Sequence, residues 1–367
     1  MTTRAFRAPG RVNLIGEHTD YNLGFVLPIA LDLACVATTV PTSGGQLRVR
    51  SENRAEEKEW DLTEVPRLQP SHDWTDYVIG VVQQLIRAGY VVGSQNIVIH
   101  SSVPEGSGLS SSAALEVSCA LAMLNGQPID RLRIAQLCQG AEREFVGIPS
   151  GIMDQYVALF GLNGSALEID CRSLTHQAVS LPPNVEIFAV NSMVKHHLAQ
   201  SAYKERTEEC AAAVQSIQAR YPQVQSLRDV DARMLAEVFD HLSDKSARRA
   251  RHVVGENERV KQFVSACQSG DLRKMGDLFF ASHRSLRLDY EVSCAELDFL
   301  VESAQAIDGV YGARLTGGGF GGCTVNLVDP AAQGKFHSEI VKRYRERFSI
   351  DPQVYRCRPS EGASEQS

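Results

Sequence analysis

Residues 10–20 have the sequence GRVNLIGEHTD and carry more information than any other stretch of the chain. The apolar side chains at positions 12, 14 and 15 indicate a strand, which ends at Gly16. Three groups that can hydrogen-bond hydroxyls, Glu17, His18 and Asp20, follow at once, and Arg11 supplies a fixed positive charge upstream. Such a strand-end loop suits a polyhydroxylated ligand, and the arginine suits an anion. The segment predicts a site for a sugar and a phosphate, with a solvated surface turn as the alternative.

The length and composition of the chain set broad limits on its class. A chain of 367 residues is too long for one ordinary core, which indicates two domains. A hydrophobic share of 43% and a charged share of 22% are typical of globular proteins in water. The net charge of -7 argues against a nucleic-acid or anionic-membrane partner, because both favour basic surfaces. Small anionic substrates are not excluded, since a local Arg or Lys can bind them.

Cysteine usage and the first residues of the sequence indicate a compartment. The 9 cysteines are scattered and include no C-x-x-C pair, which favours reduced cytosolic thiols over disulfides or a zinc site. The first ten residues contain no apolar run, so no signal peptide is expected. Pro28 and Asp32 interrupt the apolar stretch 25–40, which argues against a membrane span. We therefore expect a cytoplasmic protein. Separately, a monomer is expected rather than a stable oligomer.

Periodicity and breaker residues predict strands and helices in mixed order. Strands are expected at 25–40, 46–50, 96–101, 165–170 and 185–191, with two short strands flanking 317–322. Helices are expected at 74–88, 113–124, 129–145, 199–220, 245–266, 272–286 and 293–306, before a final helix and strand. This order indicates an α+β fold in two lobes rather than a regular βαβ series. The predicted domains are residues 1–165 and 166–358, followed by a disordered tail at 359–367.

A second motif, with the sequence PEGSGLSSSAA, lies at residues 104–114 between a predicted strand and a predicted helix. Gly106 and Gly108 allow the backbone to turn tightly and to approach a ligand closely. The serines at 110–112 place hydroxyls and free N–H groups at a helix N-terminus, which favours a triphosphate. The sequence lacks the Gly-Lys-Ser/Thr of a P-loop NTPase. The motif predicts phosphate binding, and the alternative is a serine-capped core helix after a flexible turn.

A triphosphate bound in such a loop usually needs Mg²⁺ to neutralise its charge. One serine hydroxyl and one carboxylate suffice as protein ligands, with water filling the remaining positions. Glu142, on the next predicted helix, is a candidate for the carboxylate. Glu144 is only two residues away, and sequence logic does not separate the two.

Asp154, in the segment GIMDQY at 151–156, is a third chemical candidate. Its neighbours Ile152 and Met153 are apolar, so the carboxylate is expected to be partly buried, where an unpaired charge is costly. A helix-capping aspartate near the start of the next helix is the alternative interpretation.

The glycine cluster GGGFGG at 317–322 formally matches the dinucleotide-binding pattern G-x-G-x-x-G. We reject that interpretation, because no βαβ unit and no ribose-binding acid follow the cluster. The cluster predicts either a tight turn between two strands or a backbone that passes close to a bound ligand.

Together these segments resemble the galactokinases, a family of GHMP small-molecule kinases, over essentially the whole chain. The glycine–serine loop and the C-terminal glycine turn are common to the superfamily, whereas EHTDYN at 17–22 is much more specific to galactokinases. The resemblance implies a two-lobed GHMP kinase fold with the active site between the lobes. It also implies ATP-dependent phosphorylation of α-D-galactose at C1, in the Leloir pathway of galactose catabolism. The matching segments are 10–21, 104–114, 151–155, 169–174, 201–203, 249–256, 282–294 and 315–325.

The resemblance implies a role for each matching residue. Asp154 would face the anomeric hydroxyl, and Arg11 would lie between that carboxylate and the transferred phosphoryl group. Ser112 and Glu142 would hold Mg²⁺. The residues that would hold galactose are Glu17, His18, Asp20, Gly151 and Tyr203. The residues that would contact ATP are Ser51, Trp74, Tyr77, Gly106, Ser107, Gly108, Leu109, Ser110, Ser111 and Ser112.

Three departures from the family pattern leave the catalytic groups intact. Family members usually carry about one or two more helical turns before the position of Ala8. Ser150 stands where many members have cysteine, which predicts an effect on the breadth of sugars accepted. Leu23 replaces a polar residue that often follows Tyr-Asn.

Two other functions compete with galactose phosphorylation. A sibling kinase would act on another sugar, such as N-acetylgalactosamine or arabinose, but such relatives tend to differ around EHTDYN and GIMD, which are intact here. A non-enzymatic sensor would bind galactose and ATP and regulate a partner. Sensors of this family shorten the serine loop, which has its full length here. The sequence therefore favours a galactose kinase.

Overall fold

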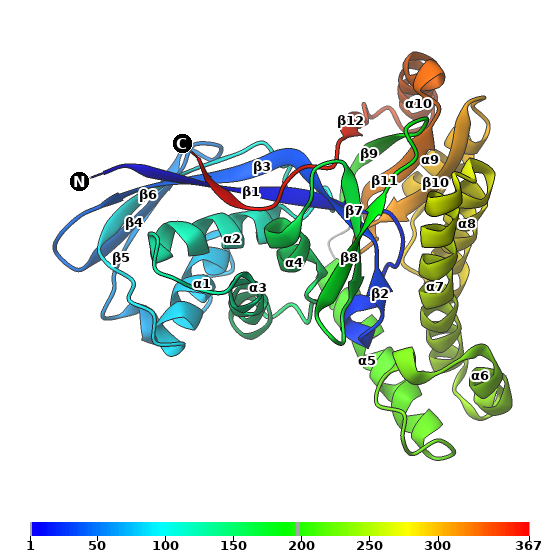
Figure 1. The fold of residues 1–367 in the computed structure, drawn as a ribbon, viewed down its shortest axis with the longest axis horizontal. Coiled ribbons are helices and arrows are strands. Elements are labelled where there is room, and N and C mark those ends of the chain that lie inside the picture. Colours follow the sequence, from blue (N-terminus) through cyan, green and yellow to red (C-terminus); the bar gives the residue numbers. More distant parts are fainter. Residues whose placement is uncertain (1, 196–198, 367) are drawn as a thin grey trace.

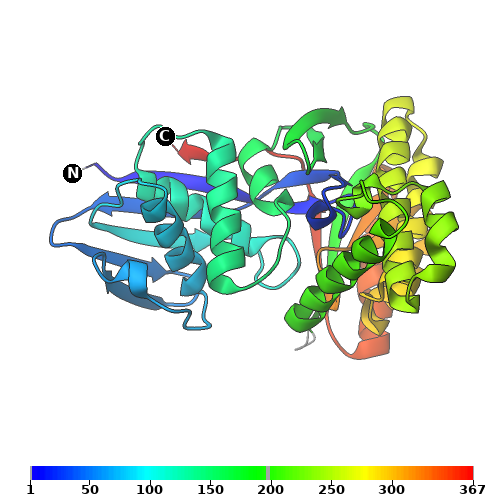
Figure 2. The same ribbon diagram turned by 90° about the horizontal axis from the view of Figure 1, so that it is seen from below.

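Two lobes with a small sheet between them make up the computed structural model, which describes residues 2–195 and 199–366 (Figures 1 and 2). The first lobe contains a six-stranded sheet in the order β13-β1-β3-β6-β4-β5. Its strands are β1 (Arg4–Asn13), β3 (Pro28–Pro41), β4 (Gln46–Ser51), β5 (Glu56–Asp61), β6 (Gln95–Ser101) and β13 (Ser364–Gln366). Its helices are α1 (Thr75–Arg87), α2 (Ser111–Leu124), α3 (Arg131–Gly140) and α4 (Met153–Phe160).

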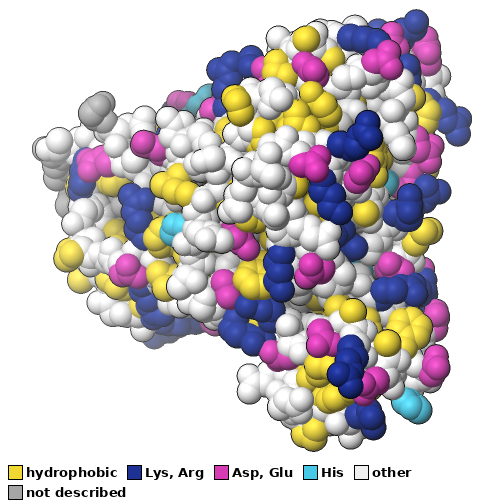
Figure 3. All heavy atoms as spheres, turned by 45° about the vertical axis from the view of Figure 1, so that its right-hand side comes forward, with side chains coloured by type: hydrophobic (Ala, Val, Ile, Leu, Met, Phe, Trp, Pro, Cys, Tyr) yellow, Lys and Arg dark blue, Asp and Glu magenta, His cyan; other side chains and the backbone are white. Residues whose placement is uncertain are grey.

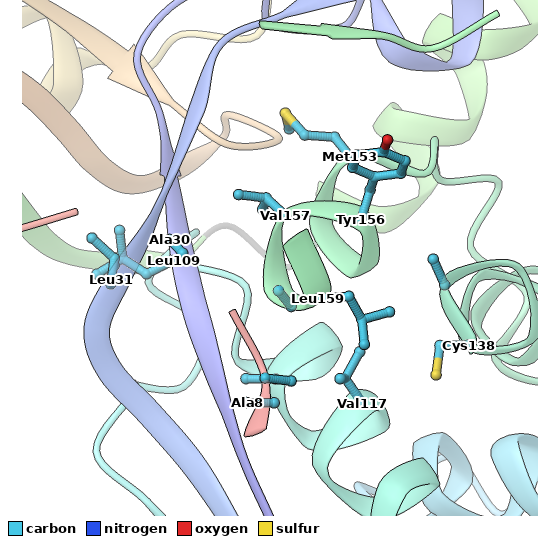
Figure 4. Packing of buried hydrophobic residues seen from close by; sticks show 14 of the residues in the cluster. Ala8, Ala30, Leu31, Leu109, Val117, Cys138, Met153, Tyr156, Val157 and Leu159 are labelled. Atoms are coloured by element: carbon cyan, nitrogen blue, oxygen red, sulfur yellow. The ribbon is translucent and has the colours of Figure 1, made fainter. Parts of the chain in front are cut away.

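Helix α2 fills the layer between this sheet and the other helices of the first lobe. Its sequence, SSAALEVSCALAML, is apolar or small on nearly every side, as expected of a helix buried all round. Figure 4 shows Val117 of α2, Leu159 of α4 and Ala8 of β1 in this layer, and all three are buried. The start of α2 lies beside the end of β1, where the Arg11 N–H donates to Leu109 O at 3.0 Å. The core packing therefore places the serine loop next to the GRVNLIGEHTD segment.

The second lobe contains a four-stranded antiparallel sheet in the order β10-β11-β9-β12. Its strands are β9 (Glu186–Lys195), β10 (Val310–Thr316), β11 (Gly321–Val328) and β12 (Gln353–Cys357). Its helices are α5 (Ala199–Gln218), α6 (Ala232–Val238), α7 (Asp244–Ser269), α8 (Leu272–Ser285), α9 (Ala295–Gln305) and α10 (Gln333–Phe348). Between the lobes lies a three-stranded sheet, on which α7 packs, with the order β2 (Phe25–Val26), β7 (Ser165–Asp170) and β8 (Thr175–Ser180).

The predicted α+β class and the two-lobed form are confirmed, and most predicted elements are present. The helix predicted at 129–145 is interrupted, because α3 ends at Gly140 and a π-helical turn follows at Ala141–Val146. The strand β5 was not predicted, because its sequence EEKEWD is mostly exposed and has no apolar alternation. The division of the chain near residue 165, where β7 begins, stays a prediction.

The prediction of a disordered tail is wrong for the described residues 359–366. After β12 the chain returns to the first lobe, where β13 pairs with β1 (Figure 1). Gly362 and Ala363 are buried against α4, and a Cβ on Gly362 would lie 2.3 Å from Leu159 O. The Ala363 N–H also donates to Ala158 O at 2.7 Å. The polar composition predicted disorder, but backbone hydrogen bonds and small side chains, which composition does not encode, order the segment.

Deletion of residues 362–367 is expected to destabilise the protein by about 2–4 kcal/mol, because several backbone hydrogen bonds are lost together. The deletion also leaves the edge of β1 unpaired at residues 5–7. Denaturant unfolding of the two proteins measures the difference. Glu365→Gln is the matched control, since the Arg4–Glu365 ion pair is solvent-exposed and contributes little by itself. An unchanged free energy of unfolding in the deletion variant would show that the segment is not needed for stability.

Candidate active site

Two cavities adjoin one another, one of about 810 Å³ and one of about 140 Å³. The larger one is lined by the first lobe and by Gly318 of the second, and the smaller one by residues of both lobes. They share three lining residues, Arg11, Asp154 and Gly318. The larger cavity is within the range of sites that bind nucleotides and other cofactors. Because Arg11 and Asp154 form part of both linings, these two residues separate the two spaces and reach both.

Arg11 and Asp154 form a bidentate ion pair. Arg11 Nε donates to Asp154 Oδ1 at 2.8 Å, and Arg11 Nη2 donates to Oδ2 at 2.9 Å. The Ser110 hydroxyl also donates to Oδ2. The Asp154 side chain is 26% exposed, whereas that of Arg11 is only 6% exposed. A buried guanidinium thus holds a carboxylate that remains open to a ligand.

Local structure explains how these groups meet. Arg11 lies near the end of β1, and Asp154 lies in the first turn of α4. The N-cap of α4 is Ile152, which makes no side-chain cap hydrogen bond, so the interpretation of Asp154 as a helix cap is wrong. Ser110 takes a left-handed conformation, with φ 60°, at the N-cap of α2. A non-glycine residue rarely adopts this conformation unless its surroundings enforce it, as they often do at functional sites.

All five residues predicted to hold the sugar line the smaller cavity. Residues 17–20 form the turn after β1, and Gly151 lies just before α4. Tyr203 comes from α5, in the second lobe. The cavity is thus assembled from both lobes. The five residues are Glu17, His18, Asp20, Gly151 and Tyr203.

His18 has one ring nitrogen paired and the other unpaired. Nδ1 lies 2.8 Å from the Tyr21 hydroxyl, which lies 2.7 Å from that of Tyr290. Nε2 is buried and has no hydrogen-bond partner among the described residues. Burial, aided by neighbouring basic residues, lowers the pKa of His18 well below its usual value, so the ring is neutral. A neutral ring with an unpaired buried nitrogen suits a ligand hydroxyl.

Asp20 and Gly151, which also line this cavity, lie in contact. A Cβ added to Gly151 would lie 1.9 Å from Asp20 Oδ2, so only glycine leaves room for the carboxylate. Burial, reinforced by the negative charge of Asp154, raises the pKa of Asp20 to about 7. Ligand hydroxyls that donate hydrogen bonds to this buried carboxylate would stabilise its ionised form.

The affinity for the sugar is expected to decrease as the pH falls below about 7, because protonated Asp20 cannot accept charge-assisted hydrogen bonds. The pKa is raised, so the ionised fraction falls about tenfold for each pH unit below it, and the Kd should rise in proportion. Calorimetry with sugar alone, from about pH 5.5 to 8.5, measures this dependence. Asp20→Asn should bind more weakly and lose the inflection. A pH-independent Kd in the unmodified protein would exclude this role for Asp20.

Most residues predicted to contact the nucleotide line the larger cavity. The exceptions are Ser107 and Leu109, which do not line it and whose side chains are buried. Ser107 Oγ donates to Pro104 O at 2.8 Å, and Leu109 O accepts from the Arg11 N–H. These two residues therefore shape the loop instead of presenting side chains to a ligand. The residues that line the cavity are Ser51, Trp74, Tyr77, Gly106, Gly108, Ser110, Ser111 and Ser112.

The glycine cluster at 317–322 forms a turn between β10 and β11 at residues 317–320, as predicted, and its last two glycines begin β11. It packs against the serine loop, backbone to backbone. A Cβ on Gly317 would lie 3.1 Å from Gly108 O, and one on Gly322 would lie 2.9 Å from Ser107 O. Both glycines also have φ near 80°, which disfavours other residues. Glycine is required here by the close approach of the two loops from different lobes.

Ser112, which lines the larger cavity, and Glu142, which lines the smaller one, lie close together. Ser112 Oγ lies 3.4 Å from Glu142 Oε1. Glu142 Oε2 accepts hydrogen bonds from Ser150 Oγ at 2.6 Å and from Gln155 Nε2 at 3.0 Å. Glu144 instead faces solvent, with 62% of its side chain exposed. The structure thus identifies Glu142 as the candidate metal ligand, a choice between Glu142 and Glu144 that the sequence left open.

Comparisons with known proteins agree with this geometry. The family model described as "Galactokinase galactose-binding signature" matches residues 2–40. The models described as "GHMP kinases N terminal domain" and "GHMP kinases C terminal" match residues 76–162 and 263–346. The galactokinase of Roseiflexus sp. (strain RS-1) is 45% identical over 361 residues, which is 97% of this chain and 91% of that protein. This chain belongs to the galactokinase family.

Other galactokinases and kinases extend the comparison. The galactokinase of Chloroflexus aurantiacus is 43% identical over 99% of this chain and 93% of that protein. The crystal structure of Lactococcus lactis galactokinase complexed with galactose superposes with a TM-score of 0.94 and 36% identity, over 99% of this chain and 95% of that one. A mevalonate kinase structure, at 18% identity and a TM-score of 0.67, shares the fold over 96% of this chain and 98% of that one.

Two departures from the usual galactokinase pattern have clear positions in the structure. Ser150 lines the smaller cavity, where its hydroxyl donates to Glu142. Leu23 is 38% exposed and lines neither of the two cavities. Of these two positions, therefore, only Ser150 touches the site of this galactokinase.

Arg314 and Thr316 of β10 are site residues that the sequence analysis missed. Arg314 is fully buried, and its Nη2 lies 2.8 Å from Glu17 Oε1 as an ion pair. Thr316 Oγ1 and the Gly317 N–H donate to the same oxygen at 2.9 and 2.7 Å. The available signal was an arginine within the apolar strand sequence VYGARLT, because a charge buried in a strand needs a partner. In this galactokinase that partner is the carboxylate predicted to bind sugar.

Proposed function

We propose that this protein transfers the γ-phosphoryl group of ATP to the C1 hydroxyl of α-D-galactose, giving α-D-galactose 1-phosphate and ADP. The observation that carries the proposal is the Arg11–Asp154 pair, which belongs to the lining of both cavities. A group in this position can touch a sugar on one side and a nucleotide on the other. Membership in the galactokinase family supports the same reaction.

Galactose is held in the smaller cavity in this proposal. Ionised Asp20 accepts hydrogen bonds from hydroxyls, and the unpaired Nε2 of His18 bonds another. Glu17 already accepts several internal hydrogen bonds, so it acts through its remaining lone pairs and by shaping the wall. Tyr203 contributes an aromatic wall, with its ring centroid 5.5 Å from that of His18.

The chemical step needs alignment and charge neutralisation more than covalent help. The C1 oxygen forms a bond to the γ-phosphorus while the bond from that phosphorus to the bridging oxygen of ADP breaks. The proton of the C1 hydroxyl passes to Asp154, whose carboxylate Arg11 orients through two hydrogen bonds. Arg11 also faces the larger cavity, where its charge offsets that of the transferred phosphoryl group.

The donor set at Ser112 and Glu142 fits Mg²⁺. Their oxygens lie 3.4 Å apart, close to the roughly 2.9 Å between neighbouring ligands of an octahedral ion with bonds of about 2.05 Å. Among the described residues, no group of three or more His, Cys, Asp or Glu side chains is arranged as a cage. That agrees with an ion bound mainly by phosphate oxygens and water. When bound, Mg²⁺ would neutralise the charge of the triphosphate.

Glu142→Gln is expected to raise the Mg²⁺ concentration needed for half-maximal activity by about tenfold or more, because it removes the charged ligand. Glu144→Gln is the matched control, two residues away but exposed, and should behave like the unmodified protein. Electron paramagnetic resonance of Mn²⁺ bound to the enzyme–ADP complex gives a second readout that does not depend on turnover. Equal metal affinities in the two variants would remove Glu142 from the metal site.

An assay of ADP release tests the proposed function directly. ATP and Mg²⁺ are supplied with galactose, N-acetylgalactosamine, glucose, arabinose or galacturonate, and Asp154→Asn serves as the blank. A strong preference for galactose is the expected result. An equal or higher rate with another sugar would move the substrate while keeping the kinase chemistry, which would be the sibling-kinase outcome. Tight galactose binding without turnover would support the sensor.

We also propose that the protein acts in the cytoplasm, as a monomer, on small molecules alone. All nine cysteines are free, which suits a reducing compartment. Figure 3 shows basic and acidic side chains interspersed over the second lobe, unlike the continuous basic surface that binds nucleic acid. Within residues 2–195 and 199–366, none of the helices combines the length and apolar character needed for a bilayer span.

A further inference from the structure

The motif RARHVVGE at residues 249–256 matches the family pattern, yet none of its residues lines either of the two cavities described above. It lies on α7, in the second lobe. Three of its polar residues, Arg249, His252 and Glu256, are fully buried. His252 and Glu256 contact the backbone of the turn at residues 16–18, which belongs to the first lobe and carries Glu17 and His18. The motif therefore contacts the backbone of residues whose side chains line the sugar cavity, and does not line the cavity itself.

Glu256 holds the start of this turn. Its Oε1 accepts from the Gly16 N–H at 3.0 Å and from Ser282 Oγ at 2.7 Å, and Oε2 accepts from Arg259 Nε at 2.6 Å. Burial alone would raise the pKa of Glu256, but neighbouring positive charges, Arg259 above all, lower it to about 2. The carboxylate is therefore ionised, and it gives the Gly16 N–H a strong acceptor.

His252 holds the middle of the turn. Its Nε2 lies 3.1 Å from Glu17 O, and a carbonyl oxygen can only accept, so Nε2 carries the proton. Burial lowers the pKa of His252 to about 4, so the ring is neutral. Nδ1 lies 3.0 Å from Ser285 Oγ, and the Ser285 hydroxyl donates to Asp289 Oδ2, also at 3.0 Å. Contacts at both ring nitrogens fix the orientation of the ring.

The turn needs external support because its backbone is unusual. Gly16 has φ 101° and His18 has φ 63°, and the second value is unfavourable for a residue with a Cβ. Small shifts of this backbone would move the side chains of Glu17 and His18 relative to a ligand. A binding site keeps its affinity when the residues that support it hold its geometry to within a fraction of an ångström.

We propose that His252 and Glu256 are positioning residues that preorganise the sugar-binding turn from the second lobe. The proposal rests on the proposed roles of Glu17 and His18 in galactose binding. It assigns the 249–256 motif a task in sugar affinity that is separate from nucleotide binding, since the larger cavity has no contact with either residue. Galactose affinity should therefore depend on these contacts, while the KM for ATP should not.

Three variants test the proposal: Glu256→Gln, His252→Leu and His252→Gln. Calorimetry without nucleotide gives the Kd for galactose, and steady-state assays give the KM for each substrate. Glu256→Gln and His252→Leu are expected to raise the Kd about tenfold or more, with the KM for ATP changed less than twofold. His252→Gln should recover much of the affinity, because the glutamine amide can place an N–H close to the position of Nε2.

A matched control separates positioning from general loss of stability. Cys267→Ala alters a buried residue of the same helix, 11 positions beyond Glu256 and therefore about 16 Å further along it. It should lower the melting temperature without changing the Kd for galactose. Where Glu256→Gln does not fold, Ser285→Ala takes its place, since it frees His252 without removing a charge. A galactose Kd equal to that of the control in folded variants would overturn the proposal. Failure of the proposed function would appear earlier, as absence of galactose binding in the unmodified protein.

Discussion

Asp154→Asn is expected to lower kcat by about 10³-fold or more, equivalent to about 4 kcal/mol of activation free energy. The amide cannot accept the proton of the C1 hydroxyl, and it leaves the Arg11 charge without a carboxylate partner. The effect should fall mainly on kcat, because the lost interaction develops as the C1 oxygen attacks the phosphorus. Initial rates of ADP release at saturating galactose and ATP measure it.

The fold is expected to survive this substitution. Asparagine has nearly the same shape as aspartate, and the Asp154 side chain is 26% exposed, so no buried void is created. Galactose affinity by calorimetry and the melting temperature are the controls, and both should stay close to those of the unmodified protein. Activity within tenfold of the unmodified protein would remove Asp154 from the mechanism.

Glu17→Ala is expected to impair both galactose binding and folding. The sequence alone predicts mainly a loss of affinity, because the residue lies outside the reacting centre. The structure adds a second effect, since Glu17 is 2% exposed and pairs with fully buried Arg314. Removing one partner of a buried ion pair leaves an uncompensated charge and costs about 3–5 kcal/mol. This is the largest effect on stability that we expect from one substitution at the site.

A double-mutant cycle separates the two effects of Glu17. Arg314→Met removes the orphaned charge, so Glu17→Ala combined with Arg314→Met should recover part of the stability but none of the galactose affinity. Denaturant unfolding gives the stabilities, and the KM for galactose gives the affinity. An unchanged KM in Glu17→Ala would contradict a role in sugar binding. An unchanged free energy of unfolding would contradict the importance of the Arg314 pair.

Much of the site could be predicted because its residues follow directly from short motifs at the ends of regular elements. The turn after β1, the serine loop before α2 and Asp154 at the start of α4 each combine a local break with polar groups. A helix N-terminus and a strand end leave backbone groups free to bind a ligand, so candidate sites at such positions can be recognised from the sequence. All five predicted sugar residues meet in one cavity for this reason.

The parts that could not be predicted depend on contacts between distant segments. The π-helical turn at Ala141–Val146 directs Glu142 inward and leaves Glu144 exposed, and periodicity does not encode it. The ion pair of Arg314 with Glu17 joins residues about 300 positions apart, which no local pattern shows. Ser107 and Leu109 belong to the loop motif, but their buried side chains stabilise the loop and do not face the cavity. Sequence motifs thus identify a functional loop more reliably than they assign each of its residues.

The return of β13 to the first lobe has a consequence for the order of events during synthesis. The edge of β1 at residues 5–7 finds its native partner only when residues 364–366 have been made. At about 5–20 residues per second, that interval lasts roughly 20–70 s on the ribosome. Throughout it, an early strand presents unpaired N–H and C=O groups that could template association with other chains. Nascent galactokinase of this type should therefore depend on chaperones most strongly before its final residues emerge.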